Sequence, residues 1–109
     1  MGNIITQPFS LSIRDENSKI IAGVYGLTFF DYARVEYTWV DEQYRKRGLG
    51  RKLFQKLEEY CRSKGCSIIQ LDTLDFQSPS FYEKMGFEYI GTVSEWIHGH
   101  DCYFMRKML

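Results

Sequence analysis

The sequence predicts an α/β (α+β) fold, in which a mixed, mostly antiparallel and twisted sheet has helices packed on it. Strand-like segments of alternating or β-branched residues occur toward both ends of the chain. A strongly amphipathic helical segment lies between them, followed by a short buried strand. No linker, repeat or low-complexity tract interrupts the 109 residues, so we expect one domain over residues 1–109.

The N-terminal part is predicted to form three strands. Residues 9–14 alternate apolar and polar side chains, and residues 19–30 are rich in β-branched and aromatic types. A polar turn cluster at 15–18 joins them as a hairpin. Residues 34–40 form the next strand. Strict alternation there would place Val35, Tyr37 and Trp39 on one face and Glu36, Thr38 and Val40 on the other.

Two helices, a buried strand and two closing strands are predicted next. Apolar side chains recur at helical spacing over residues 48–64, and residues 67–74 form the buried strand. Ser78 and Pro79 predict the N-cap and first position of a short helix. Antiparallel strands over 87–93 and 102–108 follow, separated by a loop that contains Gly99.

Composition excludes several classes of function. Fourteen basic and fourteen acidic residues cancel, so no global field directs the chain to nucleic acid or to a membrane surface. The apolar stretch over residues 20–30 is too short to span a bilayer, and residues 1–3 lack signal-peptide features. Cys61, Cys66 and Cys102 have no metal-binding spacing and are expected to be reduced core residues, as in a cytoplasmic protein without metal.

The turn before the long helix is strongly basic. Five of the eight residues from Arg45 to Lys52 are Arg or Lys, and these charges oppose the helix dipole. An anion bound to the free N–H groups of the first helical turn would offset that cost. Gly48 and Gly50 leave room for a phosphate, but no P-loop or dinucleotide-binding pattern is present. The residues alone leave open a specific phosphate site or a basic face for solvent or nucleic acid.

Two motifs favour the phosphate site by resemblance. Arg45-x-x-Gly48-x-Gly50 resembles the Gln/Arg-x-x-Gly-x-Gly/Ala motif of the GNAT superfamily of N-acetyltransferases, at the same place between a strand and a helix. The stretch over residues 71–87, which ends in FYEKMGF, is similar to the second half of that family. The resemblance covers roughly residues 9–109.

The resemblance implies transfer of an acetyl group from acetyl-CoA, a co-substrate, to a primary amine of a small-molecule or protein acceptor, by direct attack in a ternary complex. The backbone at the end of the third strand would bind pantetheine. The basic turn would bind the pyrophosphate through N–H groups and charged side chains. The residues expected at this site are Trp39, Val40, Arg45, Lys46, Arg47, Gly48, Leu49, Gly50, Arg51, Lys52 and Tyr82.

Two side chains are expected at the reaction centre. Tyr82 stands where the family's tyrosine protonates the leaving thiolate; the alternative is a core aromatic. Glu36 is the expected general base, since it would share a strand face with Thr38 and Val40; the alternative is a carboxylate that orients the amine. A backbone N–H at or beside Val40 would stabilise the oxyanion.

Three polar residues are weaker candidates for the acceptor side. Asp72 and Asp75 follow a buried strand and could attract a cationic amine, while Asp75 could equally cap the next turn. Gly99-His100 resembles a family feature near the acceptor cleft, and His98 with His100 is a weak metal pattern.

The chain departs from the family pattern at its start. Only residues 1–8 precede the first predicted strand, where the family has a strand and helices that wall the amine site. We therefore expect a shortened domain or a wall supplied by a second copy, in a homodimer that exchanges its final strands. The alternative functions are a non-catalytic CoA-binding or regulatory module and a basic-patch nucleic-acid binder.

Overall fold

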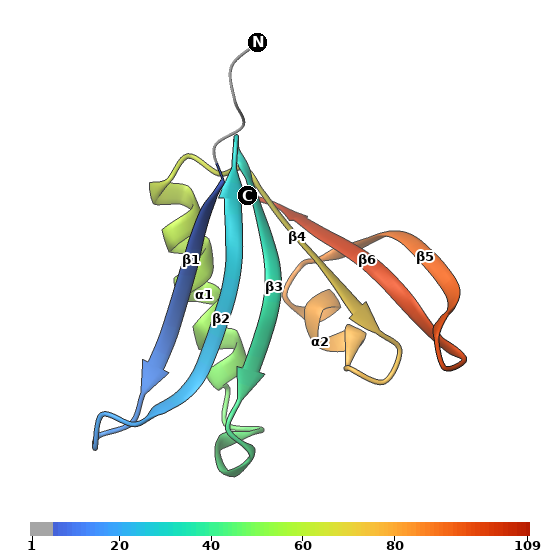
Figure 1. The fold of residues 1–109 in the computed structure, drawn as a ribbon. Coiled ribbons are helices and arrows are strands. Elements are labelled where there is room, and N and C mark those ends of the chain that lie inside the picture. The colour runs from blue at the N-terminus through green and yellow to red at the C-terminus, as the bar shows by residue number, and fades with distance from the viewer. Residues whose placement is uncertain (1–5) are drawn as a thin grey trace.

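The computed structural model describes residues 6–109, which form one sheet of six strands with two α-helices packed on it (Figure 1). The mixed fold predicted from the sequence is confirmed. The elements are β1 (Gln7–Arg14), β2 (Ile20–Phe29), β3 (Tyr32–Val40), a 3-10 turn (Glu42–Tyr44), α1 (Leu49–Ser63), β4 (Ile68–Leu74), α2 (Pro79–Lys84), β5 (Glu88–Ile97) and β6 (His100–Met108).

The sheet divides into two parts at its only parallel pair within the described residues. The strand order is β1-β2-β3-β4-β6-β5, and every neighbouring pair except β3 and β4 is antiparallel. β3 and β4 pair over three positions alone, Tyr32–Arg34 opposite Ile68–Gln70. Beyond these pairs the two strands diverge, as Figure 1 shows.

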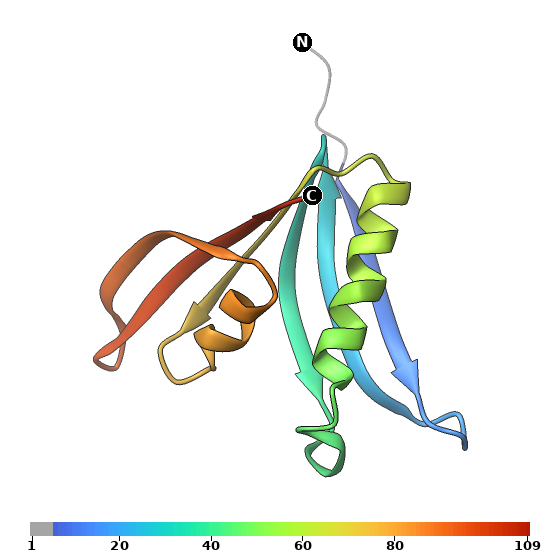
Figure 2. The ribbon, with the colours of Figure 1, turned by 180° about the vertical axis from the view of Figure 1, so that it is seen from behind.

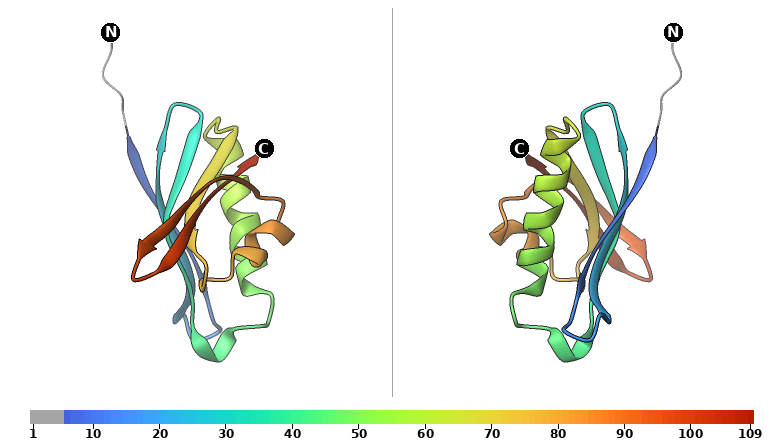
Figure 3. Two further views of the ribbon diagram at one scale, coloured as in Figure 1. Left: turned by 90° about the vertical axis from the view of Figure 1, so that its right-hand side faces the viewer. Right: turned by 90° about the vertical axis from the view of Figure 1, so that its left-hand side faces the viewer.

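Helix α1 covers one face of the strands β1, β2 and β3 (Figure 2). Its buried side chains are Leu53, Phe54, Leu57 and Cys61, which recur at the spacing of one helix face. They pack against the buried side of the three strands to form the core. Helix α2 lies on the same side of the sheet as α1 (Figure 3). No helix in the part of the chain described is long and apolar enough to cross a membrane.

A cluster of aromatic rings fixes α2 against α1. The ring of Phe54, which is almost fully buried, has its centroid 6.2 Å from Phe81, 5.7 Å from Tyr82 and 6.0 Å from Phe87. A Cβ added to Gly50 would lie 2.7 Å from the Phe81 ring. Gly50 therefore allows the two helices to approach closely, a role that we did not expect from the sequence.

Strand β3 contains a β-bulge that changes which side chains face α1. Tyr37 pairs with Tyr25 and Val35 pairs with Gly26, so Glu36 has no partner on β2. Val35 is buried toward α1, and Tyr37 beyond the bulge is exposed on the opposite face. The strict alternation predicted for residues 34–40 is therefore wrong, because a bulge adds one residue to the repeat.

One further local prediction is wrong. The loop expected around Gly99 is a tight hairpin, in which residues 98 and 99 take the positive φ angles, 48° and 78°, of a two-residue turn. Irregular pairing after Val93 absorbs the additional residues and extends β5 to Ile97. The predicted start of α2 is confirmed: Ser78, at φ 61°, is the N-cap and Pro79 is the first helical residue, although within residues 6–109 the Ser78 side chain makes no capping hydrogen bond.

Replacement of Gly26 by alanine is expected to destabilise the fold. The added Cβ would overlap the carbonyl oxygen of Arg34 and lie 2.7 Å from the ring of Phe9. We expect the free energy of unfolding to fall by about 2 kcal/mol or more, with a melting temperature lower by roughly 10 °C. Gly91→Ala is the matched control, because its Cβ would meet no atom within 4 Å. Equal melting temperatures for the two variants would contradict the packing described.

Candidate active site

A hollow of about 280 Å³ lies between β3 and β4 where the two strands diverge. Side chains from β3, β4, the loop after β4 and α2 contribute to it. It brings together the two residues that the sequence places at a reaction centre, Glu36 and Tyr82. The lining residues are Val35, Glu36, Tyr37, Thr38, Leu71, Asp72, Thr73, Gln77 and Tyr82.

The inner edge of β3 presents backbone groups to this opening. Asp41 donates its N–H to the carbonyl oxygen of Ile21 in β2 at 2.8 Å. Because successive backbone groups of a strand point to opposite sides, the N–H groups of Val40 and Thr38 point away from β2, toward the opening. The Val40 carbonyl oxygen on that side accepts a hydrogen bond from Arg45 Nε at 3.3 Å. This edge can pair with an extended ligand and can donate to an oxyanion.

Tyr82 enters the hollow from α2 as a protonated phenol. Burial raises the pKa of Tyr82, and the nearby Thr38 hydroxyl offsets a smaller part of that shift. The Oγ1 atom of Thr38 is buried and has no hydrogen-bond partner within residues 6–109. The pair therefore places a proton donor and an unpartnered hydroxyl beside the open edge of β3.

Glu36 lies at the β-bulge and is joined to Asp72 through one arginine. Arg34 Nε is 3.2 Å from Glu36, and Arg34 Nη2 is 2.7 Å from Asp72. Arg34 thus connects β3 to β4 at the end of their paired segment. Contrary to the sequence prediction, Glu36 does not share a strand face with Thr38 and Val40, because the bulge inverts the alternation after it and leaves Glu36 on the exposed face.

Asp75 and His100 do not line the hollow. Asp75 accepts hydrogen bonds from the Asp101 N–H at 3.0 Å and is 2.9 Å from His100 Nδ1. The bond from Asp101 is the main cause that lowers the pKa of Asp75, and His100 adds to it. Asp75 therefore connects the loop after β4 to β6, a role that differs from both roles considered for it from the sequence. No group of three or more possible metal ligands occurs within residues 6–109.

The basic turn forms the start of α1, directly after β3. Gly48 occupies the N-cap at φ 77°, a conformation that favours glycine, and no side chain caps the helix. The first helical hydrogen bond runs from Lys52 N–H to the Gly48 carbonyl oxygen at 3.1 Å, which leaves the preceding N–H groups without helical acceptors. Within residues 6–109, none of the basic side chains of the turn forms an ion pair. These side chains are Arg45, Lys46, Arg47, Arg51 and Lys52, all exposed.

The basic turn is therefore suited to an anionic ligand. Free N–H groups, a positive helix end and unpaired cations all favour negative charge there. The cationic group of Arg47 lies 5.4 Å from the centre of the Tyr44 ring, which holds it at the turn. Contrary to the sequence prediction, Trp39 does not face this site, because its backbone groups point toward Gly23 on β2 and its side chain lies on the face opposite α1.

Sequence reasoning did not identify Arg34, Thr38 or Gln77 as parts of the site. Arg34 is a charged residue two positions before Glu36 in a strand rich in apolar and aromatic residues, a signal that could have found it. Thr38 and Gln77 carry no such signal, since their importance depends on the bulge and on the loop after β4.

Comparisons with known proteins point to one family. A family model described as "Acetyltransferase (GNAT) family" matches residues 4–87. Blasticidin-S acetyltransferase of Streptomyces morookaense is 30% identical over 95 residues, 86% of this chain and 70% of that protein. A crystal structure of an acetyltransferase from Bacillus cereus has a TM-score of 0.90 and 36% identity, over 95% of this chain and 74% of that one. An aminoglycoside 6′-N-acetyltransferase complexed with coenzyme A shares the fold at 18% identity and a TM-score of 0.84, over 93% of this chain and 72% of that one.

The raised pKa of Tyr82 predicts a loss of stability at high pH. The folded chain holds the phenol proton of Tyr82 more tightly than the unfolded chain. The stabilisation that this proton gives the fold is therefore complete below the unfolded pKa of about 10, and it is lost as pH rises through the folded pKa. We expect the free energy of unfolding of the natural chain to fall more steeply than that of Tyr82→Phe between about pH 9 and pH 11. Urea denaturation across this range measures it, and parallel curves would contradict the burial of the phenol.

Proposed function

The chain belongs to the acetyltransferase (GNAT) family, and on that premise we propose that it moves an acetyl group from acetyl-CoA to a primary amine by direct attack in a ternary complex. One observation carries the proposal: the open inner edge of β3 continues into a helix start with free N–H groups and unpaired basic side chains. Thioester transfer to an amine needs a binding site for an anionic, extended donor and a place for the second substrate.

Acetyl-CoA is bound in this proposal along the edge of β3 and at the start of α1. The N–H groups of Leu49, Gly50 and Arg51 bind the pyrophosphate, and the cationic side chains from Arg45 to Lys52 add charge-assisted bonds. The open backbone groups of Thr38 and Val40 pair with the pantetheine arm as an added strand would, whereas those of Trp39 point toward β2. The backbone N–H groups on this edge have no acceptor within the sheet formed by residues 6–109, which supports the assignment. Each of them exchanges a hydrogen bond to water for one to the ligand on binding.

The chain's own groups supply the chemistry of transfer. The Val40 N–H, which faces the opening, donates to the thioester oxygen as negative charge develops there. Tyr82 gives its proton to the sulfur as the carbon–sulfur bond breaks. Its raised pKa supports this role, because the phenol stays protonated at neutral pH. A product thiol and an amide result, with one proton passed from the amine to the protein.

Glu36 accepts the amine proton in the proposal, directly or through a water. The position of Glu36 in the hollow supports this role. Its ion pair with Arg34 and its exposure agree equally with the alternative role, in which the carboxylate orients the ammonium form of the acceptor. Asp72 on the opposite wall adds a second negative group. Two carboxylates at the entrance favour an acceptor that carries positive charge before it reacts.

The acceptor in this proposal is a small molecule, as the name of the blasticidin-S relative suggests. A homodimer remains part of the proposal. β5 is one of the two outer strands of the sheet, all ten of its residues are exposed, and such an edge can pair with a second copy.

Gly48→Glu is expected to abolish acetyl-CoA binding, because the new carboxylate would fill the phosphate position and repel the ligand. Gly65→Glu is a close control. Gly65 has φ 79°, against 77° for Gly48, and a Cβ at either position meets no atom within 4 Å, so backbone strain is similar. Calorimetry should show binding by the natural chain and Gly65→Glu and none by Gly48→Glu. Equal affinity in the two variants would remove the anion site from the proposal.

Tyr82→Phe is expected to lower kcat about 100-fold, the usual effect of losing a general acid, while the Kd for acetyl-CoA changes little. Tyr103→Phe is the control, a half-buried tyrosine on β6 outside the hollow. Release of CoA thiol reports turnover, and calorimetry reports binding. Unchanged kcat in Tyr82→Phe would contradict the acid role. Binding without turnover by the natural chain, with any amine, would favour the CoA-binding module.

A further inference from the structure

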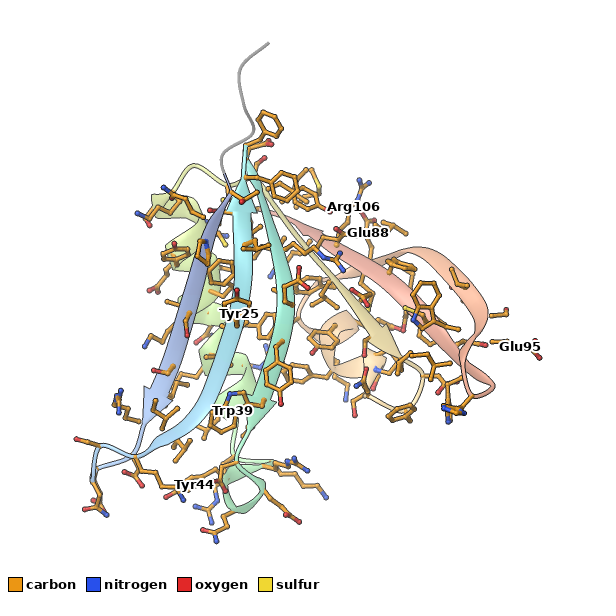
Figure 4. All side chains as sticks on the ribbon, in the orientation of Figure 1. Tyr25, Trp39, Tyr44, Glu88, Glu95 and Arg106 are labelled. Carbon is orange, nitrogen blue, oxygen red and sulfur yellow. The ribbon has the colours of Figure 1, made fainter. Side chains whose placement is uncertain are left out.

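The face of β1, β2 and β3 opposite α1 carries an exposed row of aromatic side chains. Tyr25 is 45% exposed and Tyr37 is 63% exposed, and Trp39 lies beside them (Figure 4 labels Tyr25 and Trp39). With Gly23 they line a second hollow of about 310 Å³. We call these three aromatic residues and Gly23 the aromatic shelf.

Strand register makes the shelf flat. Tyr25 on β2 is directly opposite Tyr37 on β3, and Gly23 is directly opposite Trp39. A Cβ added to Gly23 would lie 2.8 Å from Trp39 Nε1, so the indole lies over the glycine backbone. A side chain at position 23 would push the indole away from the sheet. Glycine there keeps the surface open to a second flat ring.

The outer rim of the shelf is polar. On β1, Ser10 is opposite Tyr25 and Ser12 is opposite Gly23, and both serines line the hollow. Arg14 lines it at the far end, where its side chain donates to the Ser18 carbonyl oxygen at 2.8 Å. The shelf therefore offers ring faces in its centre and hydrogen-bonding groups along one border.

The shelf is continuous with the proposed reaction centre. Tyr37 lines both hollows, and it directly follows Glu36 in the chain. Glu36 and Asp72 stand on the reaction-centre side of Tyr37, whereas none of the acidic residues among 6–109 lines the shelf hollow. A ligand with an amine near the carboxylates would thus extend its remaining atoms over aromatic rings.

We propose that the shelf binds the body of the acceptor, and that this acceptor carries its primary amine on a short arm from an aromatic or heteroaromatic ring. The inference rests on the proposed acetyl transfer and specifies its second substrate. A flat ring stacks on tyrosine and tryptophan faces in offset or edge-to-face contact. Polar atoms on a heteroaromatic rim reach Ser10 and Ser12. The amine arm passes Tyr37 toward Glu36.

The first test compares two amines of similar charge, 2-phenylethylamine and n-butylamine, as acceptors. We expect kcat/KM to be about tenfold higher for 2-phenylethylamine, because stacking of one aromatic ring gives a gain of about that size. Tyr25→Ser should remove most of that preference, chiefly through KM. Tyr89→Ser is the matched control, because Tyr89 is 43% exposed on β5, away from the shelf. Equal use of the two amines by the natural chain, or a preference that survives in Tyr25→Ser, would overturn the proposal.

The second test measures binding without transfer. In a Trp96→Phe chain, Trp39 is the remaining tryptophan. Its fluorescence is followed as each amine is added in the presence of CoA, which has no acetyl group to give. A saturable change with 2-phenylethylamine, absent with n-butylamine, supports the shelf even where no transfer is detected. Transfer to both amines with no fluorescence change overturns the shelf and leaves the acetyltransferase proposal standing.

Discussion

The site depends on the point where parallel pairing between β3 and β4 stops. Three pairs join the strands, and beyond Arg34 and Gln70 each strand has an unpaired edge. In most of a sheet, backbone donors and acceptors satisfy one another and are closed to ligands. Here the N–H groups of Thr38 and Val40 face an opening, and the turn that follows leads them directly to the free donors at the start of α1. One interruption of the ladder thus provides both a strand-like binding edge and a path to an anion site.

Aromatic packing and one arginine hold this opening in place. The ring of Phe54 on α1 contacts Phe81, Tyr82 and Phe87, so α2 is held against α1 and the phenol of Tyr82 is held at the hollow. Gly50 permits that approach. On the other face, Arg34 joins Glu36 to Asp72 across the two strands. The helices therefore border the donor side of the opening, and the exposed face carries the carboxylates and the aromatic shelf.

Local sequence patterns predicted most of the fold. Helical spacing located α1 to within one residue at each end, alternation located β1 and β3, and β-branched or apolar runs located β2 and β4. The Arg45-to-Lys52 cluster predicted the exposed basic turn at the start of α1, since charge and glycine content can be read directly from the chain. The bulge at Glu36 could not be predicted, because it depends on how β2 pairs with β3. The same is true of the role of Gly50, which is set by Phe81 on another helix, and of Arg34, whose partners lie on separate segments.

The most direct test of the account is amide hydrogen exchange of the folded chain with and without acetyl-CoA. If the ligand pairs with the open edge of β3 and the start of α1, exchange should slow about tenfold or more at Thr38, Val40 and residues 49–51. The β1–β2 turn at residues 15–18 should exchange at an unchanged rate. Protection spread evenly over the chain, or none at the β3 edge despite binding, would contradict the claim that this edge is the donor site.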